Sequence, residues 1–171
     1  MNEKTLIDKD PVNGSIYVGE VKDGKPHGKG KCTWSHGGKY VGEFKNGMAH
    51  GQGTGTHVGG VTYTGEWKNN VYNGKGTITD PNGGGKYVGE FKDGLQHGHG
   101  TSTNSNTGRK YVGEWKDGNS YGHATMTYPD GKKYVGEVKE DFKYHGQGTL
   151  THPDGKIEKG IWKDGELVER N

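Results

Sequence analysis

A Tyr-x-Gly-Glu tetrapeptide recurs along almost the whole chain, and successive tyrosines are 23 or 24 positions apart. The six copies begin at Tyr17, Tyr40, Tyr63, Tyr87, Tyr111 and Tyr134. A period of this size is typical of repeat architectures, in which each unit buries its apolar face by stacking on its neighbours. Because such a chain builds the same surface several times, the pattern favours binding or scaffolding over one asymmetric catalytic site.

Each repeat predicts a β-hairpin. The first, third and fifth residues of each repeat are tyrosine, glycine, and an aromatic residue or valine. The second, fourth and sixth are valine or threonine, glutamate, and lysine. This two-residue period is typical of a strand with two different faces. An Asp-Gly or Asn-Gly pair such as Asp93-Gly94 follows and predicts a tight turn. The chain then returns through His-Gly-x-Gly and a Thr-x-Thr segment. A second turn, for example Pro129-Asp130-Gly131, leads to the next tyrosine.

The predicted fold class is all-β: a single-layer antiparallel meander of about six to seven hairpin repeats. So many strands in one sheet favour an elongated shape, curved into a trough roughly 65 Å long. We expect an N-terminal half-repeat or cap at 1–16, six repeats at 17–157, and a degenerate C-terminal repeat or cap at 158–171. One extra residue near Asp141-Phe142 predicts a bulge or a longer turn.

Composition agrees with a thin, ordered fold. Only 26% of residues are hydrophobic and 35 are glycine, yet the aromatic residues sit at periodic positions and predict an aromatic core. The net charge of +2 gives a weak long-range field, so nucleic acid is not an expected partner. A single cysteine, Cys32, fits a reducing compartment, and the first residues lack the apolar core of a signal peptide. We therefore expect a cytoplasmic protein.

The repeated pattern resembles the MORN (membrane occupation and recognition nexus) repeat. The match is closest over residues 87–100, YVGEFKDGLQHGHG, and the resemblance covers residues 17 to about 165. It implies hairpin repeats in a curved sheet, with roles in protein scaffolding, docking of peptides or helices, dimerisation and binding of phospholipids. The chain departs from the pattern at Asn73 and Tyr121, which replace the histidine, and at Ala124, which replaces the second glycine.

Three ladders of polar residues invite other interpretations. The histidines His27, His50, His97 and His145 cannot share a metal ion, because positions one hairpin apart lie about 10 Å from each other. The same spacing keeps the ladder glutamates too far apart to form a catalytic pair. These are Glu20, Glu43, Glu66, Glu90, Glu114 and Glu137. The ladder lysines are Lys22, Lys45, Lys68, Lys92, Lys116 and Lys139. Each has a glutamate two residues before it, which predicts a neutralised, solvated face. We predict no metal, no cofactor and no enzymatic activity.

The predicted function is a non-catalytic scaffold or adaptor that binds a protein segment along an aromatic-lined concave groove. Aromatic residues that repeat on one face form the candidate partner-binding set: Tyr40, Tyr63, Trp67, Tyr87, Phe91, Tyr111 and Trp115. Aromatic residues outside the repeated positions are further candidates for partner specificity: Trp34, Tyr72, Tyr121, Phe142 and Tyr144. One alternative is a peripheral membrane linker that binds acidic phospholipids. Another is that packing consumes the rings and that contacts run through the terminal hairpin edges of a homodimer.

Overall fold

The structure is a computed structural model that describes residues 6–9, as backbone only, and residues 14–171. The chain forms two compact units, Met1–Asn82 and Gly83–Asn171, and each is described by itself. The predicted N-terminal half-repeat at 1–16 includes residues 1–5 and 10–13, which lie outside the described residues. Its residues 6–9 form a strand that pairs with the first repeat.

The strands follow one another in chain order. Those of the first unit are β1 (Leu6–Lys9), β2 (Ile16–Lys22), β3 (Lys25–Thr33), β4 (Lys39–Lys45), β5 (Met48–Thr56), β6 (Thr62–Lys68) and β7 (Val71–Asp80). Those of the second unit are β8 (Gly85–Lys92), β9 (Leu95–Asn104), β10 (Arg109–Lys116), β11 (Asn119–Thr127), β12 (Lys133–Lys139), β13 (Lys143–Thr151), β14 (Ile157–Lys163) and β15 (Glu166–Arg170).

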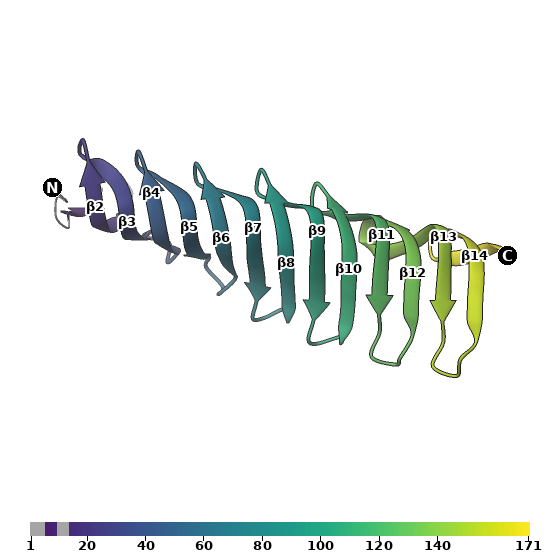
Figure 1. The fold of residues 1–171 in the computed structure, drawn as a ribbon. Coiled ribbons are helices and arrows are strands. Elements are labelled where there is room, and N and C mark those ends of the chain that lie inside the picture. Colours follow the sequence, from purple (N-terminus) through teal and green to yellow (C-terminus); the bar gives the residue numbers. More distant parts are fainter. Residues whose placement is uncertain (1–5, 10–13) are drawn as a thin grey trace. The chain divides into compact units, whose positions relative to one another are not determined.

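Each unit is an antiparallel meander, which confirms the predicted fold class. Every strand of a unit pairs with the strand that precedes it and the strand that follows it in that unit (Figure 1). The only helical segment in the described residues is the 3-10 turn η1 (Glu140–Phe142). No helix in this part of the chain has the length and apolarity needed to cross a membrane.

The predicted two-residue turns are confirmed. Between β4 and β5, Asn46 and Gly47 have φ angles of 52° and 85°, and Lys45 pairs directly with Met48. Positive φ at both central residues is the signature of a type I′ turn, whose twist matches that of the flanking strands. Asparagine and aspartate tolerate this left-handed conformation better than most residues, which explains their place before the glycine.

Aromatic rings form a ladder that crosses from repeat to repeat. The ring of Tyr40 lies edge-on to Phe44 of its own repeat, with centroids 5.0 Å apart, and to Trp67 of the next repeat, at 4.9 Å. In the second unit Tyr87 meets Phe91 and Trp115 in the same way, at 5.1 and 5.0 Å. Edge-to-face contact is the preferred geometry of aromatic pairs. A repeat therefore completes its core with a ring from the repeat that follows.

Repeat six lacks a ring at the regular position and supplies one from another position. Val138 stands at the position that Phe91 and Trp115 occupy in the two repeats before it, so it offers no ring to Tyr111. The extra residue creates η1, and η1 places the ring of Phe142 at 5.3 Å from that of Tyr111. The backbone N–H of Phe142 donates to Oγ of Ser120 at 3.0 Å, which fixes the turn in place.

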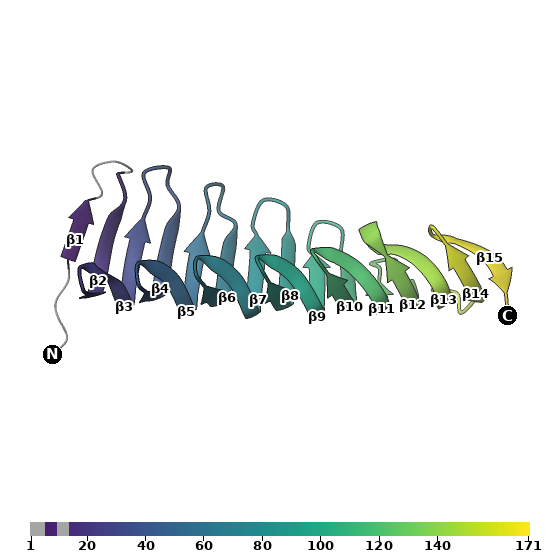
Figure 2. The ribbon, with the colours of Figure 1, turned by 90° about the horizontal axis from the view of Figure 1, so that it is seen from above.

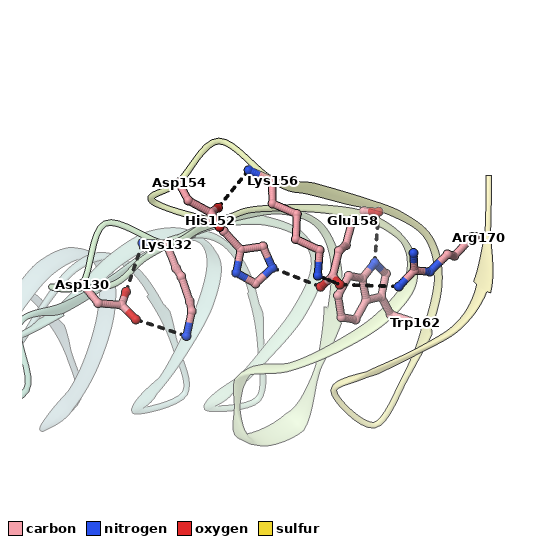
Figure 3. Close-up of polar contacts among 9 residues, drawn as sticks. Asp130, Lys132, His152, Asp154, Lys156, Glu158, Trp162 and Arg170 are labelled. Atoms are coloured by element: carbon pink, nitrogen blue, oxygen red, sulfur yellow. Dashed lines mark hydrogen bonds and ion pairs between the residues drawn. The ribbon is translucent and has the colours of Figure 1, made fainter.

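The last repeat has a charged cluster where the others have tyrosine (Figure 3). The carboxylate of Glu158 accepts hydrogen bonds from Lys156 Nζ at 2.8 Å and His152 Nε2 at 3.1 Å, and Arg170 lies 3.6 Å away. These two hydrogen bonds, that of Lys156 first, lower the pKa of Glu158 to about 2. The core at this end is held by Trp162, which is 4% exposed and donates to the carbonyl of Gly148 at 3.0 Å.

Candidate functional site

A row of small residues crosses the centre of the second unit. Gly113 pairs with Gly100 on one side and with Ala124 on the other, and Ala124 pairs with Gly136. On one face of this row tyrosine rings lie directly against the backbone: a Cβ built on Gly100 would lie 2.5 Å from Cε2 of Tyr87. The strand glycines are thus explained by close approach of a ring.

Each tyrosine ring is held by its hydroxyl. Tyr87 donates to the carbonyl of Glu90 at 3.0 Å, and Tyr111 donates to that of Glu114 at 2.7 Å. Strands of the second unit, such as β9 and β11, are visibly bent when seen from above (Figure 2). Burial raises the pKa of Tyr111 to about 12 and that of Tyr87 further still. These hydroxyls are therefore structural donors that stay protonated at neutral pH.

The predicted partner-binding rings all belong to this core. The exposed fractions are 1% for Tyr40, 0% for Tyr63, 9% for Trp67, 4% for Tyr87, 4% for Phe91, 1% for Tyr111 and 7% for Trp115. The partner-binding role assigned to them stays a prediction. Their burial leaves a partner little ring surface to contact, because each ring is covered by its neighbours in the ladder. The structure instead offers surface on the opposite face.

Three rows of side chains run across the strands on that opposite face of the second unit. Cross-strand neighbours point to the same side of a sheet, so pairing defines each row. The middle row alternates valine and threonine: Val88, Thr101, Val112, Thr125, Val135 and Thr149. We call it the Val–Thr row. Its valines are 42–47% exposed, which is unusual for a regular array of apolar side chains.

The second row, the Lys–Thr row, lies toward the hairpin-connecting loops, two residues before the Val–Thr row on β8, β10 and β12. Its members are Lys86, Thr103, Lys110, Thr127, Lys133 and Thr151. The three lysines are exposed. In the described residues, the lysines that form ion pairs are others: Lys132, Lys139, Lys143 and Lys156. The row therefore carries uncompensated positive charge.

The third row, the His–Glu row, contains His99, His123 and the ladder glutamates of this unit. Glu114 pairs with His99 across the β9–β10 ladder, and His123 pairs with Glu137 across β11–β12. Between the Val–Thr and His–Glu rows the surface is hollowed, with a volume of about 500 Å³. The side chains that line the hollow are those of His99, Thr101, Val112, His123, Thr125 and Val135, and Ala124 lies among the lining residues with Gly100, Gly113 and Gly136.

The ladder glutamates have a structural role that the sequence did not reveal. Glu43 Oε1 accepts the backbone N–H of Gln52 at 2.9 Å, and Glu66 Oε1 accepts that of Lys75 at 2.8 Å. The bulge in each hairpin lies at this glutamate, as between Gly42 and Phe44. The carboxylate replaces a ladder hydrogen bond that the bulge removes.

The expectation that these glutamates neutralise the neighbouring lysines is wrong. Within residues 14–171, no ladder glutamate makes an ion pair with a ladder lysine, and Lys139 is bound to Asp164 instead. The reason is geometric, because the carboxylate is turned toward the backbone of the returning strand. The ladder lysines other than Lys139 are therefore available to solvent or to a ligand.

The ladder histidines line no metal site in the structure. The described residues contain no group of three potential ligands that could hold a metal ion. The Nδ1 atoms of His27, His50, His97 and His145 are buried without a hydrogen-bond partner, and that of His97 lies 3.6 Å from Asp117 Oδ1. Each of these histidines precedes a left-handed glycine, such as Gly98 at φ 62°, as expected for a structural turn.

Aromatic residues outside the ladder divide into two groups. Tyr72 stacks on Tyr63 at 3.9 Å, and Tyr144 stacks on Tyr134 at 3.8 Å, so both extend the core. Trp34 and Tyr121 are exposed, at 37% and 53%. Tyr121 pairs with Glu114 at the margin of the His–Glu row, and Lys116 Nζ lies 5.5 Å from its ring centroid.

The repeated hairpins, tyrosine ladder and glycine rows define a β-hairpin repeat protein. The profile of the MORN repeat matches residues 17–39, 40–54, 63–85, 87–109, 111–133 and 134–157. The chain belongs to the MORN repeat family.

One solved structure shares the fold over most of its length. It is the TCP domain of SAS-4 (dCPAP) of Drosophila melanogaster, in complex with a proline-rich motif of Ana2 (dSTIL). The TM-score is 0.50 at 14% sequence identity, and the similarity covers 92% of this chain and 88% of that chain. At this identity the likeness concerns the fold alone. No curated protein matches the sequence at a significant level.

Proposed function

We propose that the protein is a non-catalytic scaffold that binds a segment of another protein across the strands of its second unit. The observation that carries the proposal is the hollow of about 500 Å³ beside the exposed valines of the Val–Thr row. Exposed apolar side chains that recur on one face among polar residues mark a candidate interaction site. The tyrosine ladder behind it acts as a rigid support, since its rings are buried and its hydroxyls are bonded.

Two further observations support a protein ligand. Residues 17–54 and 63–157 consist of MORN repeats, and the TCP domain of SAS-4, which has a similar fold, is in complex with a proline-rich motif of Ana2. The balanced charge of the chain argues against a surface built mainly for polyanions. The single cysteine fits the cytoplasm, which we propose as the location.

A photo-crosslinking residue placed at Val112 tests the surface directly. We expect it to capture a specific protein from the native cell extract, and Val135→Glu on the same chain to abolish that capture. The matched control is a crosslinker at Val41, which holds the corresponding position in the first unit and is 54% exposed. Equal capture from both positions, or capture unaffected by Val135→Glu in a folded protein, would show that this face is not the site.

Acidic phospholipids are a second candidate ligand, favoured by the three unpaired lysines of the Lys–Thr row. A contact of that kind weakens steeply with ionic strength. Flotation with vesicles containing phosphatidylserine separates the two. Strong flotation at physiological salt, lost in the triple variant Lys86→Glu, Lys110→Glu and Lys133→Glu, would favour the membrane over a protein segment.

A further inference from the structure

The second unit presents charge and apolar contacts at one regular interval. Lys86, Lys110 and Lys133 lie on β8, β10 and β12, and each is separated from the next by one threonine-bearing strand. Strands in a sheet are about 4.7–4.9 Å apart, so the lysines repeat every 9.4–9.8 Å or so. The valines of the neighbouring row repeat at the same interval, because they lie on the same strands two residues further along.

A ligand that crosses the strands must match this interval to use more than one lysine. A polyproline II helix has three residues per turn and rises about 3.1 Å per residue, so its faces repeat every 9.3 Å or so. An extended β-strand presents one face every 6.6–6.8 Å or so, and an α-helix brings the same face back after seven residues, at about 10.5 Å. Of these three, the polyproline II helix comes closest to the hairpin repeat.

The chemistry of the rows also fits that conformation. A polyproline II backbone makes no internal hydrogen bonds, so its carbonyls need donors from outside. Hydroxyls of Thr101 and Thr125 and the rings of His99 and His123 line the hollow and can supply them. The exposed valines offer apolar contact to proline rings. The lysines lie on one side of the valines and not on the other, so the two long sides of the site differ in charge.

We propose that the ligand of this surface is a polyproline II segment with an acidic side chain at every third residue. This inference rests on the proposed function and specifies its partner. The three acidic residues would face Lys86, Lys110 and Lys133, while the two intervening residues of each turn contact the Val–Thr row and the hollow. Two turns, or about seven residues from the first acidic side chain to the third, span the three lysines.

The first unit lacks the charge pattern and serves as an internal control. Its corresponding rows read Ile16, Thr33, Lys39, Thr56, Thr62, Thr79 and Val18, Lys31, Val41, Thr54, Thr64, Thr77. The first of these rows contains a single lysine, Lys39, and only two valines occur in the second. Lys22, Lys45 and Lys68 repeat at the same interval on this unit, but they lie four residues beyond the second row. A ligand with a regular acidic period therefore has no register on this unit that sets three lysines beside a row of three valines.

Fluorescence anisotropy with synthetic peptides tests the inference. We expect the labelled peptide of four Glu-Pro-Pro triplets to bind the full chain about tenfold more tightly than a peptide of the same composition with shuffled glutamates, as three surface ion pairs of ordinary strength would give. The triple variant Lys86→Glu, Lys110→Glu and Lys133→Glu should remove the difference. The control variant Lys22→Glu, Lys45→Glu and Lys68→Glu, with the same change of charge on exposed residues, should retain it.

Other outcomes have definite meanings. Equal affinity for ordered and shuffled peptides, or equal loss in both triple variants, would show general attraction of anions and overturn the inference. Tighter binding of a helical peptide with glutamates seven residues apart would also overturn it, in favour of a helix. If the Val112 crosslinker still captures a protein in either case, the proposed function stands and only the conformation of the partner is wrong.

Discussion

The ring of Phe142 lies against that of Tyr111, with centroids 5.3 Å apart and planes at 69°. Phe142 thus supplies to repeat five the second ring that Tyr40 receives from Trp67 and Tyr87 receives from Trp115. An insertion that interrupts the repeat in sequence therefore preserves it in space. Arg109 reinforces the contact, since its guanidinium lies 4.5 Å from the centroid of the Phe142 ring.

Phe142→Ala should destabilise the protein by about 2 kcal/mol, since it removes a half-buried ring from the ladder. Val138→Phe in the same chain restores a ring at the regular position and should recover part of the loss. Denaturant unfolding followed by tryptophan fluorescence measures both variants. Additive effects of the two substitutions would show that the rings do not share one site.

Alkaline pH should unfold the protein through its tyrosines. Burial raises the pKa of Tyr40, Tyr63, Tyr111 and Tyr134 to about 12, whereas tyrosine in an unfolded chain titrates near 10 or so. The unfolded state therefore loses these protons first. The stabilisation from protonated tyrosines is complete below about pH 10 and is lost as the pH rises toward 12 or so.

Two spectra recorded on one titration check this expectation. Tyrosinate absorbance and far-ultraviolet circular dichroism should change together, because ionisation of the buried hydroxyls requires loss of the fold. Full ionisation of the tyrosines near pH 10 with an unchanged β-sheet spectrum would contradict it.

Gly100→Ala should cost about 1–3 kcal/mol, the usual penalty of overpacking. The added methyl group would press on the ring of Tyr87, which is 4% exposed and has no free space to retreat into. Ala124 occupies the equivalent position in repeat five, so the reverse change Ala124→Gly is the matched control, and thermal melting compares the two. A Gly100→Ala protein as stable as the parent would show that the tyrosine does not pack on the backbone.

Acid should weaken the C-terminal repeat. The hydrogen bonds of Lys156 and His152 lower the pKa of Glu158 to about 2, so the stabilisation is present above the ordinary glutamate pKa and is lost as the pH falls through that lower value. Titration of the side-chain carboxyl carbon by NMR should show the depressed midpoint. In Lys156→Met the midpoint should move upward. An ordinary midpoint in the parent chain would contradict the cluster.

Much of the fold could be predicted from local pattern. The alternation around Tyr40 and the Asn46-Gly47 pair depend on neighbours a few residues apart, and the structure confirms the hairpin they predict. The role of Glu43 could not be found in this way, because its partner is a backbone N–H nine residues away and any carboxylate on a polar face looks solvated in sequence. The recurrence of a glutamate at this position in all six repeats was the one sign of such a role in the sequence.

The candidate site depends on which face of the sheet remains open, and alternation alone does not decide that. Aromatic residues dominate both cores and binding surfaces, so the ring of Tyr63 was compatible with either. The structure buries this ring between Trp67 and Tyr72. In the sequence, the exposed valines of the other face look like ordinary strand residues. Strand register shows that they form a row, in which Val112 and Val135 lie on either side of Thr125.

Sharing of rings between repeats has a consequence for how such a gene can change. Tyr87 contacts a ring of repeat five, and this contact does not depend on the segments that follow repeat five. Duplication or deletion of one whole repeat of 23 or 24 residues therefore preserves the ring pairs of the repeats that remain. Repeats five and six are the exception, because the ring that packs on Tyr111 is Phe142, which belongs to η1 in repeat six. Recombination can therefore duplicate or delete the regular repeats singly, whereas repeats five and six have to stay together.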